Sequence, residues 1–134
     1  MQRIEDIRRF GPAGLASRRA DRLLSPSAPI AARRIVRKAM AELVPAGYEQ
    51  AVALLAGADL LRDVAKWRGP TLVAWGAADV VTLPASCASV AAACVCAKRT
   101  EIADAGHAVA TEAPAEINRA LALLSAVADA GGKG

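Results

Sequence analysis

Residues 1–66 show the spacing of apolar and polar positions that is typical of helices. Gly and Pro interrupt this spacing at residues 11–12, 25–29 and 45–47, so we predict three or four short helices separated by turns. In the third helix the apolar face is formed by Ile35, Val36, Ala39, Met40 and Leu43, opposite Arg33, Arg34, Arg37 and Lys38. Such a two-faced pattern predicts a helix that packs on a core.

The pattern changes after residue 69. Residues 70–76 are a short apolar run with β-branched members between Pro and Gly, which predicts a buried strand. A helix is expected from Thr82 or Leu83 to about Cys96, then a second strand over residues 98–102 and a final helix from Pro114. Because this order implies a right-handed crossover, we predict an α/β fold in which the two strands are parallel.

Asp79 and His107 each follow one of the predicted strands. Parallel strands end at the same edge of a sheet, where open α/β sheets place their sites, and neighbouring strands lie about 5 Å apart. The sequence therefore predicts a carboxylate within reach of an imidazole, the arrangement that orients a catalytic base. Asp104 or Glu112 is an alternative partner for the ring. A capping or merely exposed histidine at position 107 and a plain turn role for Asp79 are further alternatives.

Residues 70–84, PTLVAWGAADVVTLP, together with AGHA at residues 105–108 and EAP at residues 112–114, resemble the closing part of an α/β-hydrolase. The resemblance implies that Asp79 is the acid and His107 the base of a Ser-His-Asp mechanism. Residues 1–66 resemble the cap and post-cap region of 3-oxoadipate enol-lactonase-like hydrolases, in the Gly- and Pro-containing stretches near residues 11–16, 24–26 and 45–48 and in ADL at 58–60. The fold implied is a partial α/β-hydrolase, with a helical cap (residues 1–66) before a two-strand parallel β-α-β-α unit (residues 67–134).

No nucleophile is visible. None of the serines stands in the Gly-x-Ser-x-Gly turn that exposes the nucleophile of these enzymes. They are Ser17, Ser25, Ser27, Ser86, Ser89 and Ser125. We therefore expect a truncated gene product, inactive alone, which a Ser-bearing N-terminal half would complete as a hydrolase of a small ester or lactone. Tyr48, Trp67 and Trp75 are predicted to pack in the core or cap rather than contact substrate.

The composition of the chain limits the cellular location and the cofactors that we expect. The chain is 54% hydrophobic, enough for one packed core, but it has neither an apolar leader near residue 1 nor a run long enough to span a membrane. Cys87, Cys94 and Cys96 lack nearby His or acidic residues, so we expect free thiols in a reducing cytoplasm, without a metal or organic cofactor.

The placement of the charged residues and the expected lack of a Ser-bearing N-terminal half leave two other classes of function open. Ten of the 17 Arg and Lys residues lie within residues 1–40, which would suit an anionic small substrate. They would also suit nucleic acid, although no aromatic interleaving accompanies them and we do not expect that partner. The other class is a non-catalytic interaction or structural fragment that self-associates through open sheet edges.

Overall fold

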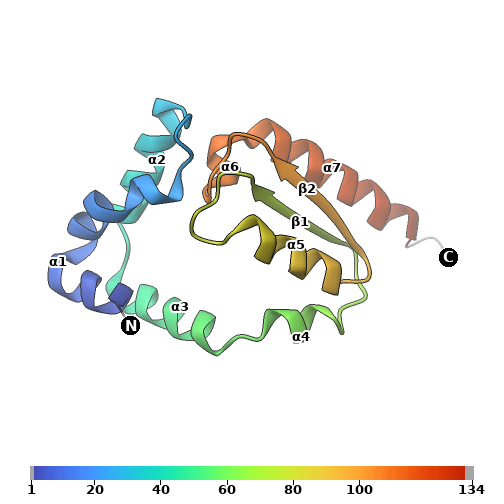
Figure 1. Ribbon diagram of the computed structural model, residues 1–134, viewed down its shortest axis with the longest axis horizontal. Coiled ribbons are helices and arrows are strands. Elements are labelled where there is room, and N and C mark those ends of the chain that lie inside the picture. The colour runs from blue at the N-terminus through green and yellow to red at the C-terminus, as the bar shows by residue number, and fades with distance from the viewer. Residues whose placement is uncertain (1, 132–134) are drawn as a thin grey trace.

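The computed structural model describes residues 2–131, and the side chains of residues 3–125. A helical part precedes a sheet part along the chain, and the two lie beside one another (Figure 1). The helical part contains α1 (Gln2–Arg19), the short 3-10 helix η1 (Ala20–Leu23), α2 (Ile30–Ala41), α3 (Pro45–Gly57) and α4 (Leu60–Val64). The sheet part contains β1 (Thr71–Gly76), α5 (Pro84–Ala93), β2 (Ala97–Ile102), α6 (Val109–Glu112) and α7 (Pro114–Gly131).

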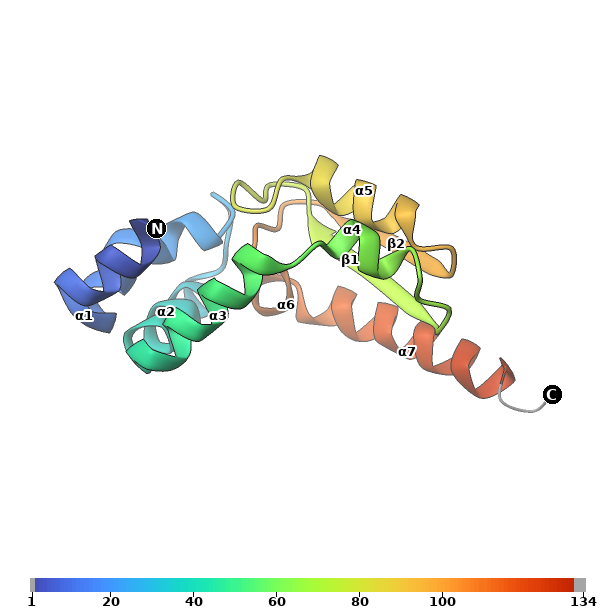
Figure 2. The ribbon, with the colours of Figure 1, turned by 90° about the horizontal axis from the view of Figure 1, so that it is seen from below.

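The two strands form a parallel sheet, as the sequence predicted. β1 pairs with β2 from Thr71 opposite Ala97 to Gly76 opposite Ile102. Helix α5 covers one face of this sheet and α7 covers the other (Figure 2). Within the described residues each strand pairs along one edge only, so the other edge of β1 lacks a neighbouring strand.

Element boundaries in the sheet part differ slightly from the prediction. Helix α5 ends at Ala93 rather than near Cys96, and β2 begins at Ala97, one residue earlier than expected. Trp75 is buried in β1, and its indole N–H donates to Oε2 of Glu101 across the strand pair at 2.7 Å, which confirms it as a packing residue. Trp67 is 57% exposed, so its predicted packing role is wrong for the described residues.

Two of the predicted turns in the helical part take unexpected forms. Residues 11–12 lie within α1, where Gly11 has a φ of 65° and kinks the helix. Glycine adopts this left-handed backbone without the clash of a Cβ. The turn predicted at residues 45–47 is wrong, because Pro45 begins α3 and Gly47 lies inside it. Proline suits a first helical position, where the amide it lacks would have no partner in the helix.

The core of the helical part is built from small side chains. Ala20, Leu24, Ala28, Ala32 and Val36 form one buried cluster, against which Met40 packs. The apolar face predicted for α2 is therefore wrong in part. Positions 32, 36 and 40, four residues apart, face the core, whereas Ile35 is 57% exposed. The small side chain of Ala32 lets α2 pack closely on η1. This close packing, and not the size of the side chains, determines which face of α2 is buried.

Other apolar side chains remain uncovered. Helix α3 has no buried residue, and Leu54 and Leu55 on it are 75% and 68% exposed. Helix α4, beside α5, exposes Leu60 and Leu61. None of the helices described is both long and apolar enough to cross a membrane.

The close approach of Gly76, at the end of β1, to the backbone at residues 105–106 can be tested by substitution. A Cβ at Gly76 would lie 2.2 Å from the carbonyl oxygen of Ala105 and 2.4 Å from that of Gly106, whereas a Cβ at Gly47 would meet nothing within 4 Å. We expect Gly76→Ala to lower the free energy of unfolding by about 1–3 kcal/mol or more, because backbone must move. Gly47→Ala should leave it unchanged or raise it by up to about 1 kcal/mol through helix propensity. Urea unfolding of the two variants decides this, and equal midpoints would contradict the close approach.

Candidate active site

Asp79 lies in the turn after β1, and its carboxylate is fixed from two sides. Oδ1 accepts hydrogen bonds from the backbone N–H groups of Val81 at 2.7 Å and Thr82 at 2.9 Å. Oδ2 lies 2.9 Å from Nδ1 of His107. Burial raises the pKa of this carboxyl, but the hydrogen bonds from His107 and the two amides outweigh it and leave the pKa below its usual value. Asp79 is therefore held as a carboxylate, although only 6% of the residue is exposed.

His107 follows β2 and meets Asp79 directly, so the predicted proximity of the two residues is confirmed. Its side chain is 38% exposed against 5% for that of Asp79. A buried carboxylate on Nδ1 and an accessible ring leave Nε2 as the nitrogen that can exchange a proton with a ligand.

Backbone contacts join the two turns. The N–H of Ala77 donates to the carbonyl of Ile102, and that of Ala78 to the carbonyl of Ala105, each at 2.9 Å. These bonds continue the strand pairing beyond Gly76 and bring the turn of Asp79 against the turn of His107. The backbone of the two turns thus brings Asp79 and His107 together.

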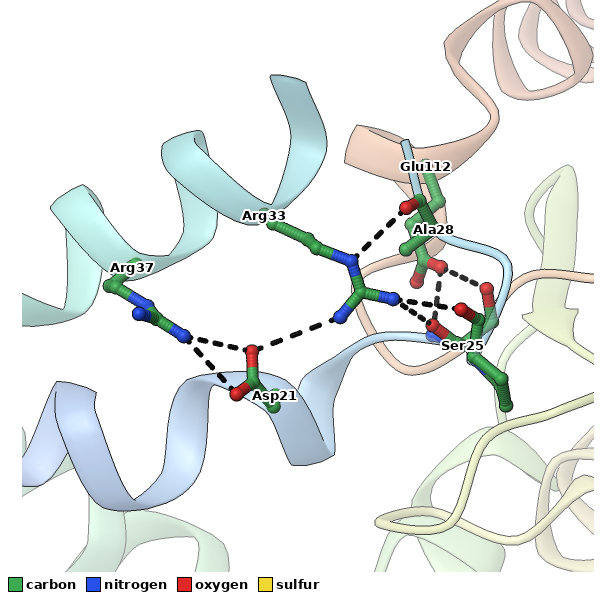
Figure 3. A network of polar contacts seen from close by, with 7 residues as sticks. Asp21, Ser25, Ala28, Arg33, Arg37 and Glu112 are labelled. Atoms are coloured by element: carbon green, nitrogen blue, oxygen red, sulfur yellow. Dashed lines mark hydrogen bonds and ion pairs between the residues drawn. The ribbon is translucent and has the colours of Figure 1, made fainter. Parts of the chain in front are cut away.

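Glu112 holds the His107 turn to the helical part. Its Oε1 accepts from the N–H of Gly106 at 2.9 Å. Its Oε2 accepts from both the N–H and the hydroxyl of Ser25, at 2.8 and 2.6 Å (Figure 3). Ser25 is 1% exposed, and the N–H of Ala108 donates to the carbonyl of Leu23 at 2.7 Å beside it. A Cβ at Gly106 would lie 2.6 Å from the backbone nitrogen of Ser25, so the junction requires glycine there.

These contacts show which of the three candidate carboxylates pairs with the ring of His107. The carboxylate of Glu112 accepts hydrogen bonds from Ser25 and Gly106. Asp104 has a left-handed backbone with a φ of 56°, and its backbone carbonyl accepts a hydrogen bond from the hydroxyl of Ser27. The ring instead meets Asp79. Both alternatives to Asp79 are therefore wrong in this structure.

Arg33 fixes the loop that carries Ser25. Its guanidinium donates to the carbonyls of Ser25 at 3.1 Å, Pro26 at 2.9 Å and Ala28 at 3.2 Å, and it lies 3.9 Å from Asp21 (Figure 3). Arg37 pairs with the same Asp21 at 3.1 Å. The loop between η1 and α2 is thus tied to α2 on one side and to Glu112 on the other.

His107 opens into a cavity of about 350 Å³ between the helical part and the sheet part. Besides His107, the cavity is lined by Arg3, Arg19, Arg22, Leu23, Met40, Leu43, Tyr48, Val80 and Val81. The sequence assigned Tyr48 to packing and gave no site role to Val80 or Val81, because the residues that complete this cavity come from helices distant in the chain. A larger open groove of about 650 Å³ along β2 and α7 contains neither His107 nor Asp79.

No serine or cysteine of the described residues lines the cavity that contains His107. Ser25 is committed to Glu112. The pKa of the Cys87 thiol is raised by burial and by the negative charge of Asp79, which disfavours the reactive thiolate. Nor do three or more metal-binding side chains gather anywhere in residues 3–125.

Two solved structures share this arrangement of elements. An esterase from Thermogutta terrifontis, described as malate-bound, superposes with a TM-score of 0.83 at 23% identity, over 95% of this chain and 48% of the esterase chain. An enol-lactonase from Burkholderia xenovorans superposes with a TM-score of 0.72 at 25% identity, over 96% of this chain and 48% of its own. The chain has the fold of the C-terminal part of an α/β-hydrolase. It spans about half the length of each of these enzymes.

No family model and no curated relative matches the sequence. The partial α/β-hydrolase fold that the sequence predicted is nevertheless confirmed by the structural matches. The catalytic roles of Asp79 and His107 remain a prediction.

The single histidine of the chain makes its hydrogen bond testable. With Asp79 as acceptor, neutral His107 should carry its proton on Nδ1. In Asp79→Asn the amide oxygen would stay with the two backbone N–H groups, so that the NH₂ group faces Nδ1 and drives the proton to Nε2. Histidine-selective ¹⁵N NMR should show the Nδ1–H tautomer in the wild type and the Nε2–H tautomer in Asp79→Asn. Asp104→Asn is the matched control and should leave the spectrum unchanged, and a wild-type spectrum in Asp79→Asn would contradict the pairing.

Proposed function

We propose that this chain supplies the acid and the base of a serine-type hydrolase of small esters or lactones, and that it is inactive alone. The observation that carries the proposal is the 2.9 Å contact between buried Asp79 and accessible His107, which lines a cavity of about 350 Å³. The esterase and enol-lactonase that share the fold support the substrate class. The helical cap, residues 1–66, would shape the cavity, and residues 67–134 would carry the chemistry.

Each proton in the proposed reaction passes through Nε2 of His107. The ring removes the proton of a serine hydroxyl as the serine oxygen attacks the carbonyl carbon of the substrate. It then gives this proton to the departing alcohol oxygen as the carbon–oxygen bond of the ester breaks. In the second half, the ring deprotonates a water molecule as the water oxygen attacks the acyl carbon. The bond between this carbon and the serine oxygen then breaks, the ring returns the proton to the serine oxygen, and the carboxylic acid leaves. Asp79 keeps the ring in the right tautomer and stabilises the imidazolium in each step.

The serine and the amides that bind the oxyanion would come from polypeptide other than these 134 residues. The unpaired edge of β1 and the exposed Leu54 and Leu55 of α3 support such a partner, since a strand edge and uncovered apolar side chains favour association. The same edge supports a second candidate, self-association of a chain that performs no chemistry. Free Cys87, Cys94 and Cys96 support a reducing compartment such as the cytoplasm.

The chain alone should show no esterase activity above that of its His107→Ala variant on a short-chain activated ester. Loss of one oxyanion donor alone costs about 3 kcal/mol of transition-state stabilisation, and here the nucleophile is absent as well. Coexpression with the Ser-bearing N-terminal half of an α/β-hydrolase such as the esterase should first yield an ordered complex and then activity that requires both the added serine and His107.

Ser86→Ala is a control for this assay, because Ser86 lies in α5 outside the cavity, and it should change nothing. His107-dependent turnover by the isolated monomeric chain would overturn the requirement for a second polypeptide. An ordered, active complex in which His107→Ala has full activity would overturn the role of the base.

A further inference from the structure

The outer edge of β2, which faces away from β1, is open to a second strand. Within the part of the chain that the structure describes, β2 pairs with β1 alone. The carbonyl of Ile102 accepts from the N–H of Ala77, so the backbone groups of Ile102 point toward β1. Because successive residues of a strand direct these groups to alternate sides, those of Arg99 and Glu101 point outward. A strand that lies beside this edge would therefore meet the N–H and C=O groups of these two residues.

The side chains of Arg99 and Glu101 lie on one face of the sheet, since every second residue of a strand shares a face. Both residues are exposed. The carboxylate is oriented from β1, because Oε2 of Glu101 accepts from the indole N–H of Trp75 at 2.7 Å. Only Oε2 takes part in this bond, so Oε1 can accept from a cation beside the strand.

These opposite charges, on either side of Thr100, are complementary to a second copy of the same strand. A two-fold axis perpendicular to the sheet at Thr100 places the second β2 antiparallel to the first. Arg99 of each copy then lies opposite Glu101 of the other, on the same face of the joined sheet. The outward backbone groups of these residues meet in hydrogen-bonded pairs, and opposite charges directly across an antiparallel pair attract.

Charge favours this register over its neighbours. A slip by one pair of residues in either direction also brings outward backbone groups together, but it places Arg99 opposite Arg99 or Glu101 opposite Glu101. Like charges directly opposite one another destabilise a strand pair. Charged residues on an edge strand commonly prevent association, and here they disfavour the neighbouring registers without disfavouring this one. Strand β1 has no charged residue, so it has no pattern of this kind.

The groove beside this edge adds apolar surface to the same contact. It has a volume of about 650 Å³, runs along β2 and α7, and is lined by Thr100, Glu101 and Leu123 among others. Leu123 of α7 is 64% exposed. A two-fold axis perpendicular to the sheet keeps the α7 helices of both copies on one face, where each lies beside the joined edge and helps to cover the groove of the other.

We propose that two copies of this chain form a symmetric dimer through the outer edge of β2, in which Arg99 of each copy pairs with Glu101 of the other. This inference goes beyond the proposed hydrolase function, because the added half is assigned to the edge of β1 and the second copy to the edge of β2. The dimer should form with or without the added half, and the complemented complex should contain both polypeptides in duplicate.

Sedimentation velocity over a range of chain concentrations measures this association. The wild type should dimerise, and Arg99→Glu should raise the dissociation constant at least about tenfold, because the symmetry places like charges opposite each other in both pairs. The double variant Arg99→Glu/Glu101→Arg exchanges the two charges and should restore dimerisation. Lys98→Glu is the matched control, since it makes the same charge change on the other face of β2, opposite Ile102, and should leave the dissociation constant unchanged.

Position 100 tests the register without a change of charge, and without the loss of the Trp75 hydrogen bond that Glu101→Arg brings. The two copies of Thr100 form a non-hydrogen-bonded pair at the axis, where Cα atoms lie about 4.5 Å apart, within the range of a disulfide. Thr100→Cys should therefore give a disulfide-linked dimer on mild oxidation, with the new bond assigned by mass spectrometry. Lys98→Cys retains the same native cysteines but should not cross-link to itself, because its two copies lie toward opposite ends of the strand pair.

Three results would each overturn the β2 dimer. They are a wild type that stays monomeric at every concentration, an Arg99→Glu variant that associates as the wild type does, and equal cross-linking of Thr100→Cys and Lys98→Cys. Dimerisation that follows the expected pattern in a complemented complex without esterase activity would keep the dimer and reject only the hydrolase function. An active complex with one copy of each polypeptide would keep the hydrolase function and reject the dimer.

Discussion

The parallel pairing of β1 with β2 determines where the turns of Asp79 and His107 lie. In a parallel pair both strands end at one edge, so the turns of Asp79 and His107 must meet once Gly76 lies opposite Ile102. The backbone bonds of Ala77 and Ala78 then hold the turns together. The backbone at Gly76 lies so close to that of Ala105 and Gly106 that no Cβ fits there, and Asp79 and His107 approach to 2.9 Å beside it.

Glu112 extends this constraint to the helical part. A single carboxylate accepts hydrogen bonds from Gly106, next to the base, and from Ser25, in the loop that leads into α2. Arg33 holds the same loop from the other side. The cavity walls contributed by Leu23 and Arg22 are thereby held relative to His107, since the loop they precede cannot shift without breaking these part-buried hydrogen bonds. The same network of hydrogen bonds therefore positions His107 and holds the walls of the cavity.

The sequence was sufficient for what local pattern determines. Strand and turn signals predicted the parallel unit, and motif order predicted that Asp79 and His107 would meet. Contacts between distant segments could not be read in this way. Ser25 resembled an ordinary loop serine until the fold placed it on Glu112, 87 positions away. Ile35 was assigned to the core-facing side of its helix together with Val36 because of their spacing, yet the packing of α2 on η1 buries Ala32 and Val36 and leaves Ile35 exposed. Arg3, Arg19 and Arg22 share a cavity only because α1 runs past it.

We propose that Asp79 and His107 form a preassembled acid–base pair that acts on a serine outside this chain. A fluorophosphonate reacts with a serine only when a base has activated it, so mass spectrometry of the complemented complex after such treatment shows whether the pair activates that serine. We expect one adduct, on the serine of the added half, which disappears with His107→Ala and is strongly reduced with Asp79→Asn. An adduct on any serine of this chain, or labelling of the added half that persists in His107→Ala, would contradict it.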